Sequence, residues 1–72
     1  MTKEEFMVQM QDVLQTEETL TAETMLVDLE EWDSLSIMAT MAFVDKNFGI
    51  KLKMSDFKEI ETMSDLMGRV GL

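Results

Sequence analysis

The chain has 72 residues, 46% of them hydrophobic, so we expect it to fold as a single domain, residues 1–72. Fifteen acidic against six basic residues give a net charge of −9, which disfavours nucleic acid and anionic lipid as partners and favours a basic protein surface. The chain contains no Cys and no His, which excludes thiolate metal sites, Ser–His triads and the common zinc ligand sets. We therefore expect neither an enzyme nor a metal site.

The first predicted element is a helix from Thr2 to about Gln15. Thr2 and Glu5 have the spacing of a capping box, which marks a helix N-terminus. The apolar residues of this segment recur at helical spacing and predict one buried face. They are Phe6, Met7, Met10, Val13 and Leu14.

Residues 16–33 break the helical periodicity. This segment has seven acidic residues and no basic one, together with four threonines. It also carries large apolar residues, which a solvated loop would not contain: Leu20, Leu26, Val27, Leu29 and Trp32. We interpret it as a long ordered connection packed against the core, and a connection of this length suggests a functional role.

A second helix is predicted from Ser34 to about Asn47, with Asp33 as its N-cap and Gly49 just beyond its end. It carries two apolar stripes. The first is the expected core face, with Met41 and Val44 in the core: Ile37, Met41, Val44 and Phe48. The second consists of Leu35, Met38, Ala39 and Ala42. Either the helix is contacted on several sides, or the second stripe is partly exposed as a docking surface.

The remaining chain predicts two further helices. Residues 50–53 form an extended link, and a short helix begins at Ser55 or Asp56. Thr62 and Asp65 cap a last helix whose apolar residues are Met63, Leu66, Met67 and Val70. The predicted fold is all-α: three main helices and one short helix, with a long ordered loop between the first two main helices.

The tripeptide Asp33-Ser34-Leu35 stands where the acidic connection enters the second helix. With the size, the charge, the helix order and the Phe48-Gly49-Ile50 helix end, it resembles the acyl carrier protein family, which includes peptidyl and aminoacyl carrier domains. The resemblance covers the full chain. It implies that Ser34 bears a covalent 4′-phosphopantetheine derived from coenzyme A, whose thiol carries an acyl or aminoacyl thioester. It also implies that Asp33 presents Ser34 to the transferase.

The implied partners are a phosphopantetheinyl transferase and acyl or aminoacyl ligases or synthases with basic docking surfaces. The residues expected to bind them are Leu35, Met38, Ala42, Glu30 and Glu31. The N-terminus lacks the apolar segment of a signal peptide and no apolar run approaches the ~20 residues of a membrane span, so we expect a cytoplasmic protein. We also expect a monomer.

Three positions depart from the commonest pattern of that family. Glu31 stands where many members have Gly, Ser36 where an acidic residue is common, and Thr40 where a large aliphatic residue is common. These departures put the housekeeping carrier of fatty acid synthesis in doubt and make a specialised stand-alone carrier that serves one pathway at least an equal alternative. The cargo stays open among fatty acyl, polyketide, amino acid and D-alanine.

Two other classes of function fit parts of the sequence. A calcium-binding loop beginning at Asp28 would need Gly at its sixth position and Glu at its twelfth, but these hold Asp33 and Ala39. The alternative that stays open is a helical adaptor without a prosthetic group, which would bind a basic partner through its acidic face. Modification by a transferase in the presence of coenzyme A separates it from a carrier.

Overall fold

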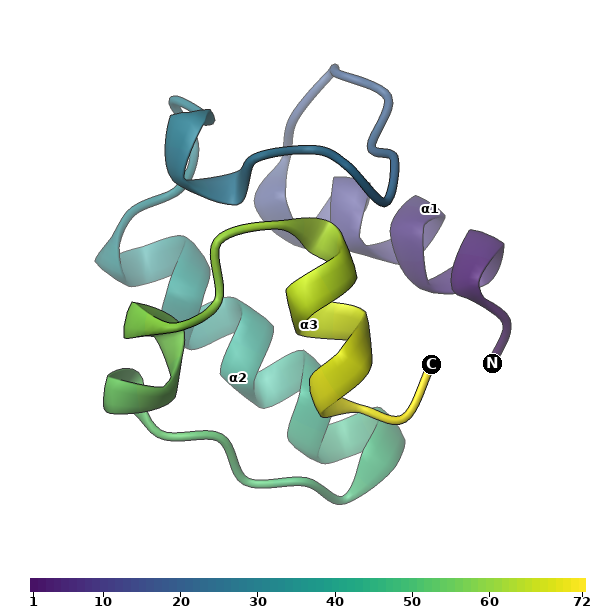
Figure 1. Ribbon diagram of the computed structural model, residues 1–72, viewed down its shortest axis with the longest axis vertical. Coiled ribbons are helices and arrows are strands. Elements are labelled where there is room, and N and C mark those ends of the chain that lie inside the picture. The colour runs from purple at the N-terminus through teal and green to yellow at the C-terminus, as the bar shows by residue number, and fades with distance from the viewer.

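Three α-helices and two short 3-10 helices make up the computed structural model, which describes residues 1–72 (Figure 1). Their bounds are α1 (Lys3–Leu14), η1 (Leu26–Asp28), α2 (Ser34–Phe48), η2 (Met54–Lys58) and α3 (Met63–Arg69). The chain has no strand, so the predicted all-α fold is confirmed. The short helix differs from the prediction, because it begins at Met54 and is a 3-10 helix. None of the helices is long and apolar enough to cross a membrane.

Each α-helix begins with a reciprocal capping box. In α1, the N–H of Glu5 donates to Thr2 Oγ1 at 3.1 Å, while the N–H of Thr2 donates to Glu5 Oε1 at 2.9 Å. Thr62 and Asp65 make the same arrangement at the start of α3. Both boxes lie where the sequence predicts them. They satisfy backbone donors that have no partner within the helix.

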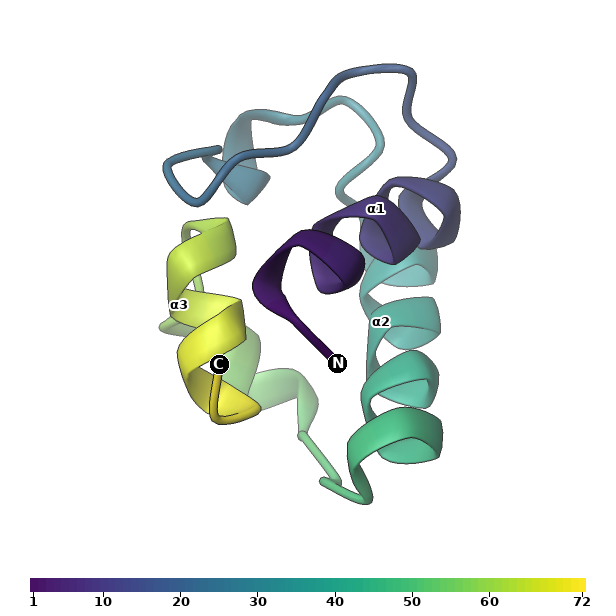
Figure 2. The same cartoon turned by 90° about the vertical axis from the view of Figure 1, so that its right-hand side faces the viewer.

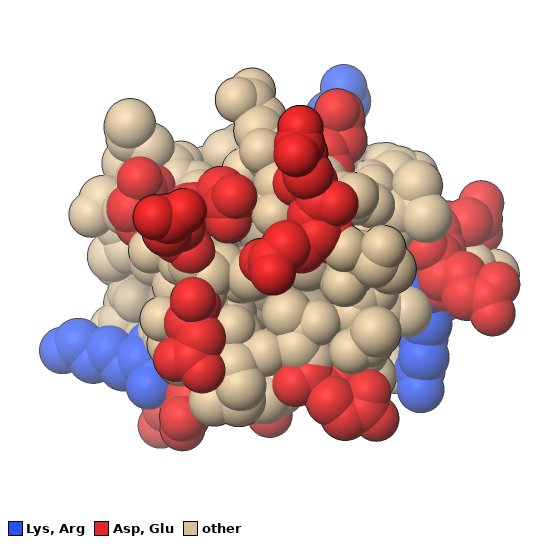
Figure 3. All heavy atoms as spheres, turned by 90° about the horizontal axis from the view of Figure 1, so that it is seen from above, with Lys and Arg blue, Asp and Glu red and all other residues tan.

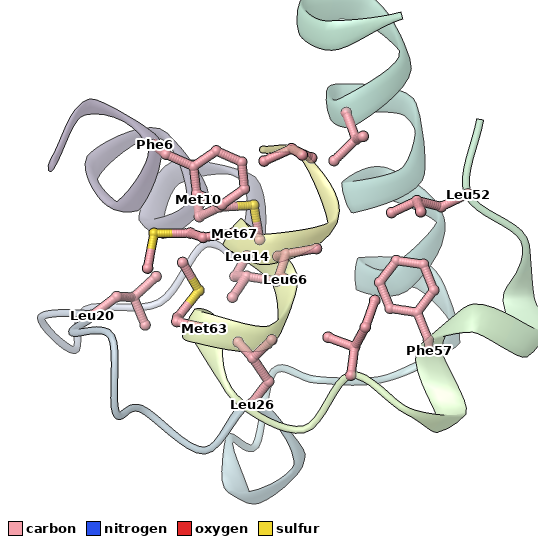
Figure 4. Close-up of a cluster of buried hydrophobic side chains, with 13 residues drawn as sticks. Phe6, Met10, Leu14, Leu20, Leu26, Leu52, Phe57, Met63, Leu66 and Met67 are labelled. Carbon is pink, nitrogen blue, oxygen red and sulfur yellow. The ribbon is translucent and has the colours of Figure 1, made fainter. Parts of the chain in front are cut away.

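Side chains from all three α-helices, the connection and η2 form a single core (Figure 4). The buried residues of α1 are Phe6, Met10 and Leu14. The ring centroid of Phe6 lies 5.6 Å from that of Phe43 and 5.8 Å from that of Phe48, both on α2. The four apolar residues predicted for the last helix segment are all buried. The 3.6-residue spacing therefore identified the buried faces of α1 and α3.

The buried face of α2 differs in part from the prediction. Val44 is fully buried as predicted, but Met41 is only half-buried at the edge of the core. Thr40, which the apolar pattern omits, is fully buried. Its hydroxyl donates to the Ser36 carbonyl at 2.8 Å, and this hydrogen bond offsets the cost of burying a polar group.

The connection between α1 and α2 is ordered and packed against the core, as predicted. Leu20 and Leu26 are buried, and the segment pairs with the start of α3 through an isolated bridge between Met25 and Thr62. The N–H of Leu26 donates to the Glu61 carbonyl at 2.8 Å. The chain thus passes from α1 across to the start of α3 and returns to the start of α2 (Figures 1 and 2).

An ion-pair cluster joins η2 to α3. The guanidinium of Arg69 lies 3.2 Å from Asp56 Oδ1 and 3.0 Å from Glu59 Oε2. The pKa of Asp56 is lowered, first by the N–H that Lys53 donates to its carboxylate and then by Arg69. Since η2 also contacts α2, this cluster helps to hold η2 beside the second helix.

Candidate functional site

The N-terminus of α2 is fixed by Asp33 and Ser36. Asp33 Oδ1 accepts the N–H of Ser36 at 2.9 Å, and Ser36 Oγ accepts the N–H of Asp33 at 2.8 Å. The Ser36 hydroxyl also donates to the Asp33 carbonyl at 3.0 Å. The prediction of Asp33 as N-cap is confirmed, whereas the contribution of Ser36 to the cap was not predicted. The signal was available, since residue N3 of a helix completes a capping box.

Ser34 and Ser36 differ in environment although they are two residues apart. Ser36 is half-buried and both functions of its hydroxyl are used in the cap. Ser34, the first residue of α2, is exposed, and its hydroxyl makes no hydrogen bond within the protein. The N–H groups of Ser34 and Leu35 belong to the first turn and have no partner inside the helix. A free hydroxyl therefore lies at the positive end of a 15-residue helix.

The second apolar stripe of α2 is exposed. Leu35 has 76% of its surface accessible and Met38 has 56%, and Ala39 and Ala42 are exposed as well. The helix is therefore not covered on all sides, because α1 and η2 contact it and leave the second stripe uncovered. This exposed stripe, defined by Leu35, Met38, Ala39 and Ala42, runs along α2 from a position next to Ser34.

Acidic side chains are spread over the face formed by the connection (Figure 3). Residues 16–33 contribute −7 of the net charge of −9. Glu30 is exposed, whereas Glu31 is half-buried and its Oε1 has neither a hydrogen-bond partner nor solvent contact. Glu31 thus turns only part of its carboxylate outward. No three acidic residues are arranged so as to hold a metal ion.

A search against family models finds that residues 5–70 match the model described as phosphopantetheine attachment site. Neither the search of curated proteins nor that of solved structures found a match. Because the match covers nearly the whole chain, the protein belongs to the phosphopantetheine-binding carrier family, as the resemblance to acyl carrier proteins predicts.

Family membership establishes the general role. Members carry a covalently attached 4′-phosphopantetheine and have no catalytic activity of their own, which confirms the predicted cofactor and the prediction that the protein is not an enzyme. A carrier of this kind interacts with a phosphopantetheinyl transferase and with synthase enzymes. The residues at the start of α2 fit such a group, since an exposed free hydroxyl and unpaired N–H groups suit a phosphodiester.

Proposed function

We propose that the protein carries acyl or aminoacyl intermediates as thioesters on a 4′-phosphopantetheine attached to Ser34. One observation supports the choice of residue. Of the two serines at the start of α2, Ser34 alone is exposed with an unused hydroxyl, whereas the Ser36 hydroxyl is part of the cap. A transferase could modify Ser36 only by breaking that cap. Modification of Ser34 leaves the cap intact.

The helix N-terminus supports the same assignment electrostatically. A phosphodiester on Ser34 would carry its negative charge beside the first N–H groups of α2, where the helix dipole favours an anion. The bound group supplies the thiol on which a thioester forms, and a chain without Cys has no thiol of its own. Asp33 fixes the helix start and so holds Ser34 at a defined position.

The proposed docking surface for partner enzymes combines the exposed stripe with the acidic residues that precede it. Leu35, Met38 and Ala42 supply accessible apolar surface, and Glu30 and the outward part of Glu31 supply negative charge. Opposite charges on carrier and enzyme would accelerate the encounter, and apolar contact would hold the complex. This combination fits enzymes with a basic, partly apolar docking surface.

An intact-mass measurement tests the proposal against the adaptor alternative. The protein is incubated with coenzyme A and a promiscuous phosphopantetheinyl transferase, then weighed. A gain of one phosphopantetheine supports the carrier proposal. No gain, under conditions in which a known carrier domain is fully modified, would instead favour an adaptor that binds a basic partner through its acidic face.

A further inference from the structure

Trp32, the only tryptophan in the chain, lies two residues before Ser34 and has one unused hydrogen-bond donor. Its indole packs against Phe57 of η2, with ring centroids 5.9 Å apart and planes tilted by 49°. Phe57 is buried and extends from η2 towards α2 (Figure 4). Trp32 is itself half-buried. The two rings form an aromatic wall that connects the residues before α2 to η2.

A single residue with extended backbone, Asp33, separates Trp32 from Ser34. Asp33 has φ −143° and ψ −174°, which is extended backbone. An extended residue holds its two neighbours, here Trp32 and Ser34, almost as far apart as the chain allows. Their Cα atoms are then roughly 6.6 Å apart. A group attached to Ser34 therefore begins its path two residues from Trp32, within reach of its indole.

The residues on either side of Ser34 also border a different surface. The Asp33 side chain turns towards Ser36, and a surface hollow lies between the end of α1 and the start of α2. The hollow is lined by Val13, Gln15, Asp33, Leu35, Ser36 and Ala39. Ser34 does not line it. This hollow is therefore the alternative surface for an arm on Ser34.

The indole N–H of Trp32 is available to a ligand. It donates to no group of the protein. Among the buried side-chain nitrogen and oxygen atoms, only Glu31 Oε1 lacks a hydrogen-bond partner. The unpaired indole nitrogen is therefore not buried and has access to solvent. A tryptophan in such a position offers an apolar ring and a polar donor together. Phosphopantetheine has matching parts, since two methyl groups lie close to its phosphodiester and its two amide carbonyls accept hydrogen bonds.

We propose, resting on the function proposed above, that Trp32 is the contact surface for the part of the phosphopantetheine arm nearest Ser34. The arm leaves Ser34 towards η2, with its methyl groups on the indole ring and a phosphodiester or amide oxygen accepting from the indole N–H. The aromatic wall with Phe57 holds the ring in place for this contact. Trp32 is thus a positioning residue that restricts the direction in which the cargo is presented.

The test is an isotope-filtered NMR experiment on the modified protein. Protein labelled with ¹⁵N and ¹³C is loaded with an unlabelled arm from coenzyme A, and its mass is checked. We expect nuclear Overhauser effects from the arm's methyl protons to the indole protons of Trp32, and none to the methyl groups of Val13. Nuclear Overhauser effects from the arm to Val13 alone, or to neither Val13 nor Trp32, would overturn the inference.

Two variants complete the experiment. Trp32→Phe keeps an aromatic ring against Phe57 but lacks the N–H, so effects to the ring should persist with a clear loss of intensity. Unchanged intensity would overturn the assigned hydrogen bond. In Ser34→Ala treated identically, no such effects should appear. If the wild type gains no mass, the proposed function and this inference both fail. If it gains mass while Trp32 shows no contact, only the inference fails.

Discussion

Asp33 and Ser36 hold the start of α2 through two reciprocal hydrogen bonds, 2.8 and 2.9 Å long, and leave Ser34 between them with a free hydroxyl. The side chains that define the helix start are therefore separate from the side chain proposed to be modified. This separation lets the cap be altered experimentally without removing the modification site.

Replacing Asp33 by Ala should lower the free energy of unfolding by about 1 kcal/mol, because the Ser36 N–H loses its acceptor. Asp33→Asn should lose much less, because the amide oxygen can still cap the helix. Chemical denaturation of both variants measures the difference. Equal losses in the two variants would show that charge, and not the cap hydrogen bond, sets the effect.

The two apolar stripes of α2 should respond differently to truncation. Val44→Ala should cost about 2–3 kcal/mol of stability, because it leaves a cavity in the core. Leu35→Ala and Met38→Ala should change stability by less than about 0.5 kcal/mol, since both side chains are exposed. Thermal melts measure these effects, and transfer and ligation rates should fall in the two exposed variants alone. If Met38→Ala lowered the stability as much as Val44→Ala does, the exposed stripe would be packed in solution.

Asp65 should make the stability of the protein depend on pH. Its carboxylate accepts the N–H groups of Glu61 and Thr62, which lowers its pKa. A lowered pKa in the folded state adds stability that is fully present above the unfolded pKa of about 3.9 and is lost as pH falls through the folded value. Melting temperatures across pH 2–7 should show Asp65→Asn less stable than wild type at neutral pH, with the gap closing in acid.

Thr62→Ala is the matched control for that experiment. It removes the hydroxyl of the same cap but keeps the carboxylate of Asp65, so it should retain most of the pH dependence. The role of the Asp65 carboxylate would be contradicted if the difference in melting temperature between Asp65→Asn and wild type stayed constant down to pH 2.

Salt should act in opposite directions on stability and on partner encounter. Folding brings the seven acids of residues 16–33 close together, so screening should raise the melting temperature. Screening should also slow the transfer reaction, because electrostatic steering towards a basic enzyme is lost. One salt titration measures both quantities. A transfer rate indifferent to salt would mean that docking depends on the exposed stripe alone.

Local sequence signals predicted most of the fold because the features they describe are local. The boxes at Thr2 and Thr62 and the glycine at position 49, which has φ +68°, mark helix ends through contacts between near neighbours. The pairing of Leu26 with Glu61 was not predictable in this way, because its partners lie 35 residues apart. Thr40 was missed for a related reason: its burial depends on a hydrogen bond that an apolar pattern does not register.

The candidate site was predicted to a similar extent. The sequence placed Ser34 and Asp33 at a helix start and indicated a second stripe, and the structure shows that stripe exposed. The half-buried position of Glu31 and the contact of Trp32 with Phe57 depend on how the connection folds back onto η2. Tertiary contacts of this kind leave no periodic signal in the chain.

The measurement that tests the central claim most directly is the intact mass of three proteins after treatment with coenzyme A and a transferase: wild type, Ser34→Ala and Ser36→Ala. The account predicts one added phosphopantetheine on wild type and on Ser36→Ala, and none on Ser34→Ala. Addition to Ser34→Ala, or failure of Ser36→Ala to be modified while it remains folded, would contradict the assignment of Ser34 as the attachment site.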